Sequence, residues 1–173
     1  MNDIPKTLRG VLGVSSINTF FFFISALTVL GSPNNGFNVF LTAILFALYV
    51  LGGFYVLSKS QSPVAVGFLL GVSTMITVLS LQHAIYWGQL SAAAALCDPE
   101  VAEIVDWCDH VGGMRAVCAF GSINFILSGA FTGLLAKGMD ELLEGNITTG
   151  YDNIGGGGGG FIPPPANGSG GGG

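Results

Sequence analysis

The chain has 173 residues, of which 50% are hydrophobic and only 9% charged, with a mean hydropathy of +0.68 and a formal net charge of −5. Soluble domains usually carry about 25% charged residues, so this composition excludes an ordinary soluble fold and indicates a membrane protein. The acidic balance excludes the basic surface of a nucleic-acid-binding protein.

Four apolar runs follow one another along the chain, and none of them contains Asp, Glu, Lys or Arg. They cover residues 11–30, 37–57, 64–90 and 116–136. Each is long enough to cross a hydrocarbon core, which takes about 20 helical residues. Because lipid offers the backbone no hydrogen-bond partners, each run should be a helix. The sequence therefore predicts an all-α fold, an integral membrane antiparallel four-helix bundle with helices at about 11–30, 37–57, 64–90 and 114–137.

The charges between these runs predict how the bundle is oriented. Lys6 and Arg9 precede the first run, Lys59 follows the second, and Lys137 ends the fourth. By contrast, the connection 91–113 carries five acidic residues and no cation. Positive residues remain on the cytoplasmic side, so we expect both termini there and the connection 91–113 outside or in a lumen. The chain is thus predicted to be a multi-pass protein of the plasma membrane or of an endomembrane or vesicle, with a cytoplasmic lead-in over 1–10.

Aromatic residues and a histidine gather at the outer end of the third run. His83, Tyr86 and Trp87 lie there, and Arg115 stands at the outer end of the fourth run. Such residues commonly anchor helices at the membrane–water interface, and we predict that role for all four. A histidine inside a membrane is also a candidate functional residue. Haem ligation in a bundle would normally need a second in-span histidine, so interfacial anchoring or a hydrogen bond to a neighbouring helix is favoured for His83.

Two glycine pairs have the GxxxG spacing that lets helix backbones approach closely. Gly67 and Gly71 lie in the third run, and Gly129 and Gly133 lie in the fourth. We predict helix-packing contacts at both pairs. The four runs supply no carboxylate or cation for a proton relay, which argues against an ion-coupled transporter.

The connection 91–113 raises the question of what its two cysteines do. A disulfide between Cys97 and Cys108 would close a loop of about a dozen residues, worth up to roughly 3 kcal/mol. A continuous helix would instead hold them about 16 Å apart, beyond the roughly 7 Å that a disulfide allows between Cα atoms. We favour the disulfide on the oxidising side. A zinc site recruiting His110 with Asp106 or Asp109 lacks the usual ligand spacing, and no second histidine is placed to activate a catalytic thiol.

Residues 138–173 form a predicted cytoplasmic tail that is rich in Gly and Pro. Its composition offers little apolar surface to bury and a high ordering entropy. If the tail docks on a neighbouring copy, the expected anchor is an apolar pair followed by a polyproline-II rod, namely Phe161, Ile162, Pro163, Pro164 and Pro165.

The layout of the chain resembles the MARVEL-domain family, which includes synaptophysin- and occludin-type proteins and fungal eisosome-associated proteins. The local likeness lies in "MRAVCAFGSINFILSGAFTGLLAKG", Met114–Gly138, which has an Arg at its outer end followed by small and aromatic residues. The resemblance implies a role in membrane organisation, through apposition, curvature and lateral microdomains, without catalysis. It also implies that Arg115 and the Cys97–Cys108 loop are structural.

These observations favour a non-enzymatic protein that organises or shapes membranes and self-associates laterally. Its predicted partners are membrane lipids and further copies of itself, contacted through helix faces and the tail, and it needs no cofactor, although a bound lipid or sterol is compatible with it. One alternative is a small accessory subunit of a large energy-transducing or photosynthetic complex, with His83 touching a pigment, haem or quinone. The third is a pore of the claudin or connexin kind, for which the spans offer only scattered Ser, Thr and Asn.

Overall fold

The protein was examined as a computed structural model that describes residues 4–31, 36–59, 62–97 and 108–154. Within these residues the chain is helical and has no strand. Four helices are long and apolar enough to cross a membrane, which confirms the predicted all-α bundle. They are α1 (Ile4–Thr28), α2 (Gly36–Lys59), α3 (Pro63–Ala94) and α5 (Val111–Ile154), the last preceded by the 3₁₀ turn η1 (Cys108–His110).

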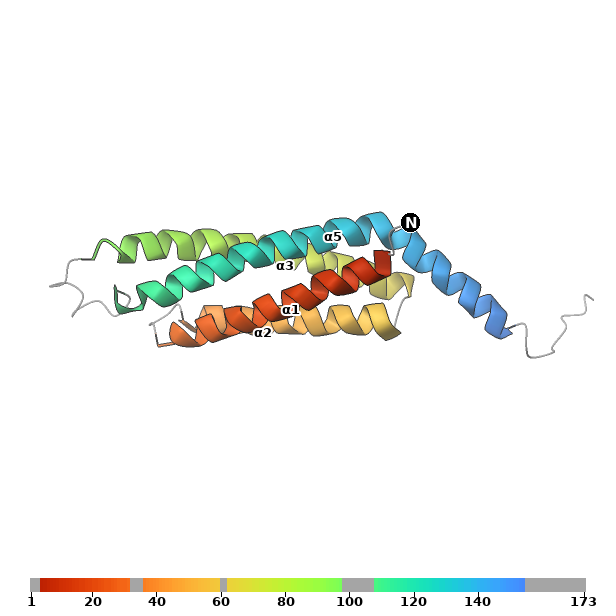
Figure 1. Ribbon diagram of the computed structural model, residues 1–173, viewed down its shortest axis with the longest axis horizontal. Coiled ribbons are helices and arrows are strands. Elements are labelled where there is room, and N and C mark those ends of the chain that lie inside the picture. The colour runs from red at the N-terminus through yellow and green to blue at the C-terminus, as the bar shows by residue number, and fades with distance from the viewer. Residues whose placement is uncertain (1–3, 32–35, 60–61, 98–107, 155–173) are drawn as a thin grey trace, which may run out of the picture.

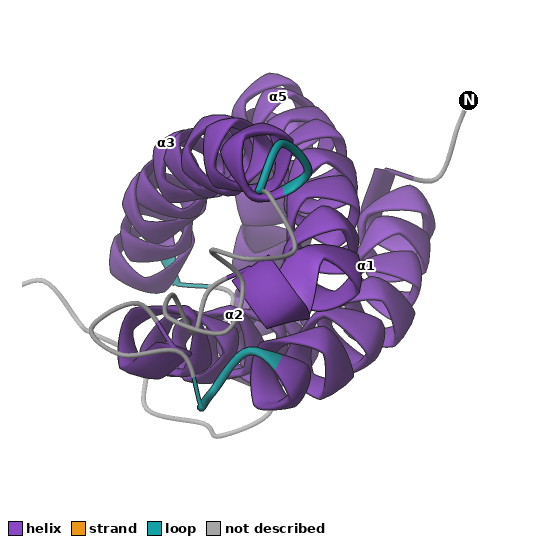
Figure 2. Ribbon diagram, turned by 90° about the vertical axis from the view of Figure 1, so that its left-hand side faces the viewer, coloured by secondary structure: helices purple, strands orange, loops and turns teal. Residues whose placement is uncertain are grey.

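The helices lie side by side and run antiparallel along one long axis (Figure 1). Viewed from the end, α5 lies beside both α1 and α3, and α2 completes the ring (Figure 2). Among helices that are neighbours in the ring, α3 and α5 pack most closely and α2 and α3 least closely. At one end of the bundle Gly138 of α5 contacts Ile4 of α1. The chain therefore enters and leaves the bundle at the same end.

The helices extend beyond the apolar runs that predicted them. α1 begins at Ile4, inside the predicted lead-in 1–10, and α5 begins at Val111 and continues to Ile154, past the predicted end at 137. The part of α5 that can span a membrane is Val111–Asp140, and its last turns leave the bundle at an angle (Figure 1). Charged side chains keep a segment out of the hydrocarbon core, but they do not end a helix, because Lys, Arg and Glu are good helix formers.

The start of α3 follows from two consecutive residues, Ser62 and Pro63. Ser62 is the N-cap, and its side-chain oxygen accepts a hydrogen bond from the backbone N–H of Ala65 at 3.2 Å. Pro63 occupies the first helical turn, where it loses no hydrogen bond and its φ is already helical. This cap begins α3 at Pro63, directly after the extended residue Ser62.

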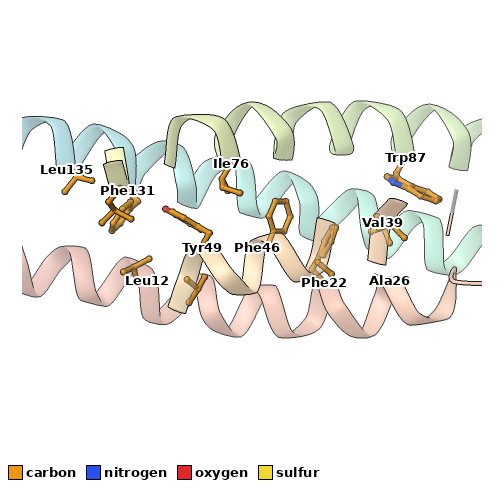
Figure 3. Close-up of a cluster of buried hydrophobic side chains, with 14 of the residues drawn as sticks. Leu12, Phe22, Ala26, Val39, Phe46, Tyr49, Ile76, Trp87, Phe131 and Leu135 are labelled. Atoms are coloured by element: carbon orange, nitrogen blue, oxygen red, sulfur yellow. The ribbon is translucent and has the colours of Figure 1, made fainter. Parts of the chain in front are cut away.

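Large side chains from all four helices fill the centre of the bundle (Figure 3). Phe22 of α1 packs on Phe46 of α2 with ring centroids 5.0 Å apart, and Tyr49 meets Phe131 of α5 edge to face at 6.0 Å. Lipid is as apolar as these side chains, so the hydrophobic effect does not hold the helices together within the membrane. Dense packing and interhelical hydrogen bonds do so instead.

The glycines that bring helices together are not the ones that the GxxxG spacing indicated. A Cβ placed at Gly121 of α5 would lie 3.6 Å from the backbone N of Ala84, and one at Gly88 of α3 would lie 3.3 Å from the Cys118 sulfur. These four residues form the seam between α3 and α5. Of the predicted pairs, only Gly129 faces another helix closely, since a Cβ placed there would lie 3.6 Å from the Thr77 side chain. A Cβ placed at any of the other three would have no neighbour within 4 Å, so the prediction of a packing contact within the bundle fails for Gly67, Gly71 and Gly133.

Replacing Gly121 with leucine should force α3 and α5 apart, because its side chain would point at the α3 backbone, which cannot rotate away. Overpacking of this kind costs about 1–3 kcal/mol. We expect a lower midpoint in thermal unfolding of the purified protein in detergent, and little effect for Gly121→Ala. The matched control is Gly133→Leu, at a glycine with no such neighbour within 4 Å. Equal losses for both leucine variants would contradict a close α3–α5 seam.

Candidate functional site

His83 lies inside the bundle, where it links α3 to α2. Its side chain is only 7% exposed, its Nε2 lies 2.9 Å from the hydroxyl oxygen of Thr42, and its Nδ1 lies 3.3 Å from the carbonyl oxygen of Leu79. Both ring nitrogens therefore have hydrogen-bond partners. Of the two roles favoured from the sequence, the structure contains the hydrogen bond to a neighbouring helix.

The other aromatic residues near His83 point in different directions. Trp87 is 1% exposed and lies over Val39 and Ala26 in the core, whereas Tyr86 is 44% exposed (Figure 3). This differs from the predicted surface anchoring for His83 and Trp87, while Tyr86 remains on the outer surface. The reason is the helix period, since one residue turns the chain by about 100°. The spacing of Ile76, Ser80, His83 and Trp87 is the sequence signal that marks the inward face of α3.

A short chain of hydroxyl groups joins α2, α3 and α5 below this level. The Tyr49 hydroxyl lies 3.2 Å from the Ser73 hydroxyl, which in turn lies 2.5 Å from that of Thr132. Nearer the disulfide-linked end, the Asn18 side chain donates to the carbonyl oxygen of Phe120 at 3.0 Å, which ties α1 to α5. These polar groups are used in contacts between helices. Their chemistry is that of structural links, with no titratable pair among them.

The disulfide predicted between Cys97 and Cys108 is present in the structure, with a Cα–Cα distance of 6.1 Å. This separation is incompatible with the alternative of one continuous helix from Cys97 to Cys108. Because each sulfur is bonded to the other, neither is available as a thiolate ligand to zinc or as a nucleophile. The bond fastens the end of α3 to η1, directly before α5. Cys118 keeps a free thiol inside the seam, 3.3 Å from the carbonyl oxygen of Ala84.

Arg9 has a structural role that the sequence analysis missed. Its guanidinium donates a 2.8 Å hydrogen bond to the carbonyl oxygen of Leu57, in the last turn of α2. The carbonyl groups in the last turn of a helix lack partners within the helix and carry partial negative charge, so a cation there is favourable. Arg115, predicted as an interface anchor, has an exposed side chain at the start of α5.

The outward face of α3 carries the first predicted glycine pair. Gly67 and Gly71 are exposed and make no contact with another helix. Large apolar side chains stand beside them on the same surface, namely Val64, Phe68 and Met75. Gly67 and Gly71 therefore form a shallow strip with apolar edges on the surface of α3, within its membrane-spanning part.

The predicted tail anchor, Phe161 to Pro165, lies outside the residues that the structure describes. No protein-family model, curated protein or solved structure matches the chain in the three comparisons made with known proteins. The resemblance to the MARVEL-domain family therefore stays a prediction from layout and from Met114–Gly138.

Proposed function

We propose that this chain is a non-enzymatic membrane protein that organises or shapes a membrane by associating laterally with copies of itself. The observation that carries the proposal is the outward position of Gly67 and Gly71, which the bundle does not use for its own packing. Two such strips can bring two α3 helices into close backbone contact, as GxxxG pairs do in membranes. Phe68 and Met75 would then pack against the partner on either side.

The interior of the bundle supports a structural role over the alternatives. A pore would need a continuous polar lining, whereas Tyr49, Ser73 and Thr132 are engaged with one another between helices. An accessory subunit that ligates a pigment or haem through His83 would have to break the hydrogen bond to Thr42 first. Among the described residues, the side chains named for these two functions are already engaged in hydrogen bonds between helices.

The proposal includes an orientation and a role for the tail. Chain entry and exit lie at one end of the bundle, where Lys6, Arg9 and Lys59 also lie, and positive residues favour the cytoplasmic side. The tail would thus extend from the cytoplasmic end and reach a neighbouring copy through Phe161 and the following prolines. The disulfide-linked end would face the exterior or a lumen, as the oxidised cysteines require.

The double substitution Gly67→Leu/Gly71→Leu should separate the copies while leaving each bundle folded, because both positions face outward. We expect the dimeric and larger species to fall markedly when labelled protein in liposomes is counted by single-molecule photobleaching. Gly133→Leu is the matched control, as it adds the same side chain to an exposed glycine of α5. Deleting residues 155–173 tests the tail separately.

The results separate the parts of the proposal. If the double variant and Gly133→Leu associate as well as the unmodified protein, the α3 face is not the interface. If the unmodified protein is monomeric at all densities, lateral self-association is wrong. If tail deletion leaves the assemblies unaltered, the tail has no part in them.

A further inference from the structure

A continuous groove runs between α2 and α3 along most of the bundle. It consists of three adjoining cavities of about 600, 510 and 280 Å³. Val78 and Gln82 line both the first and the second, while Leu45, Val72 and Ile76 line both the second and the third. Because neighbouring cavities share lining residues, they adjoin one another along the side of the bundle.

The groove exists because α2 and α3 are joined differently from the other neighbouring helices. The α3–α5 seam is built from small residues, whereas α2 and α3 are bridged by hydrogen bonds from long side chains, Thr42 to His83 and Tyr49 to Ser73. The α2 and α3 backbones approach each other least of all neighbours in the ring. The space left between them opens toward the surrounding lipid, where Val78 is 62% exposed.

The two ends of the groove differ in chemistry. At the end near the disulfide it is lined by three residues with amide side chains, Asn38, Gln82 and Gln89, and by His83. Toward the other end the walls are apolar and include Leu45, Val72 and Phe68. No Lys, Arg, Asp or Glu is among the residues that line any of the three cavities.

We propose that this groove binds an uncharged lipid whose head offers several hydrogen-bonding groups, of the diacylglycerol type. Amides both donate and accept, so the three that line this end of the groove suit a head with a hydroxyl and ester carbonyls. A phosphate head would call for Arg or Lys, which the lining lacks. The single hydroxyl of a sterol would leave most of the amides without a ligand partner.

The groove is more than long enough for the tails of such a lipid, because the tails in one leaflet cover about half of the hydrocarbon core. From Gln89 to Phe68 the helix rises about 32 Å at 1.5 Å per residue, about the thickness of the hydrocarbon core. A chain that starts at the amides in one leaflet can therefore lie against Val78, Leu45 and Val72 over its whole length. The groove contains neither Gly67 nor Gly71, although it shares Phe68 and Met75 with the proposed self-association face. The glycine pair is therefore the part of that face that can be changed without changing the lining of the groove.

Photo-crosslinking of the full chain in phosphatidylcholine nanodiscs tests the proposal. The probe is diacylglycerol with a diazirine in one acyl chain, and matched phosphatidylglycerol and cholesterol probes are compared at the same density. We expect diacylglycerol to label α2 and α3 along the groove. Val78→Trp should block the junction between the polar and apolar parts and lower this labelling about tenfold, as a loss of 1.4 kcal/mol in affinity would. Val14→Trp, at an exposed position of α1, should leave it unchanged.

The remaining arms decide the head chemistry and the location. Gln82→Leu/Gln89→Leu should remove the preference for diacylglycerol over the other two probes. Labelling should persist in Gly67→Leu/Gly71→Leu, and its loss there would place the lipid between copies and overturn the proposal. Equal labelling by all three probes around every helix, or a preference for the anionic lipid or the sterol, would also overturn it.

Discussion

Trp87→Ala is expected to destabilise the bundle by about 3 kcal/mol, the cost of a cavity the size of an indole ring at about 24 cal/mol per Å³. Trp87 is among the largest fully buried side chains of the described residues and contacts the core shared by α1, α2 and α3. Lipid is as apolar as the core, so burying the indole ring gains nothing from the hydrophobic effect. The loss of stability in Trp87→Ala therefore comes from the unfilled volume and the lost dispersion contacts.

The free thiol of Cys118 provides the measurement, because it lies in the α3–α5 seam. When a maleimide reaches the Cys118 thiol only after the bundle opens, the reaction rate follows the fraction of open protein. A loss of about 3 kcal/mol in stability should then speed the reaction about a hundredfold. Trp87→Phe should lose less, since it keeps an aromatic ring. Phe37→Ala, which removes an exposed aromatic side chain of α2, should label like the unmodified protein. If Trp87→Ala labelled no faster than Phe37→Ala, the site would not be tightly packed.

Removing the disulfide with Cys97→Ser/Cys108→Ser is expected to cost about 3 kcal/mol, from the freedom that the unfolded chain regains when a loop of about a dozen residues is no longer closed. The bond joins residues 11 apart in the chain and holds the start of α5 against the end of α3. We expect a lower midpoint when the protein is unfolded by SDS in mixed micelles and followed by circular dichroism.

Reduction supplies the control for this variant. Dithiothreitol should lower the midpoint of the unmodified protein to that of the double-serine variant and should not change the variant itself. Cys118 is the third of three cysteines and remains in both proteins, so any effect through its thiol would be shared. A reductant that shifts both proteins equally, or neither, would show that the Cys97–Cys108 bond does not contribute to stability.

The sequence alone predicts helix positions well and helix faces poorly. Four runs without charge locate the membrane-spanning part of each helix because lipid rejects charges and leaves the backbone no partner but itself. The same reasoning misses the start of α1 at Ile4, since helices continue readily into water. The disulfide could be predicted because its two cysteines share a short connection outside the spans.

Only the tertiary structure decides which side chains face another helix. In a soluble protein polar residues mark the outside of a helix, but in a membrane both faces are apolar, so Gly67 and Gly121 look alike in the sequence. The structure places Gly121 against the α3 backbone and Gly67 toward lipid. In the same way it turns Trp87 inward and Tyr86 outward, and it opens the groove between α2 and α3. The number and position of the membrane-spanning helices follow from how each stretch of the chain is solvated locally. The α3–α5 seam, the outward strip on α3 and the α2–α3 groove depend instead on contacts between residues that are far apart in the sequence.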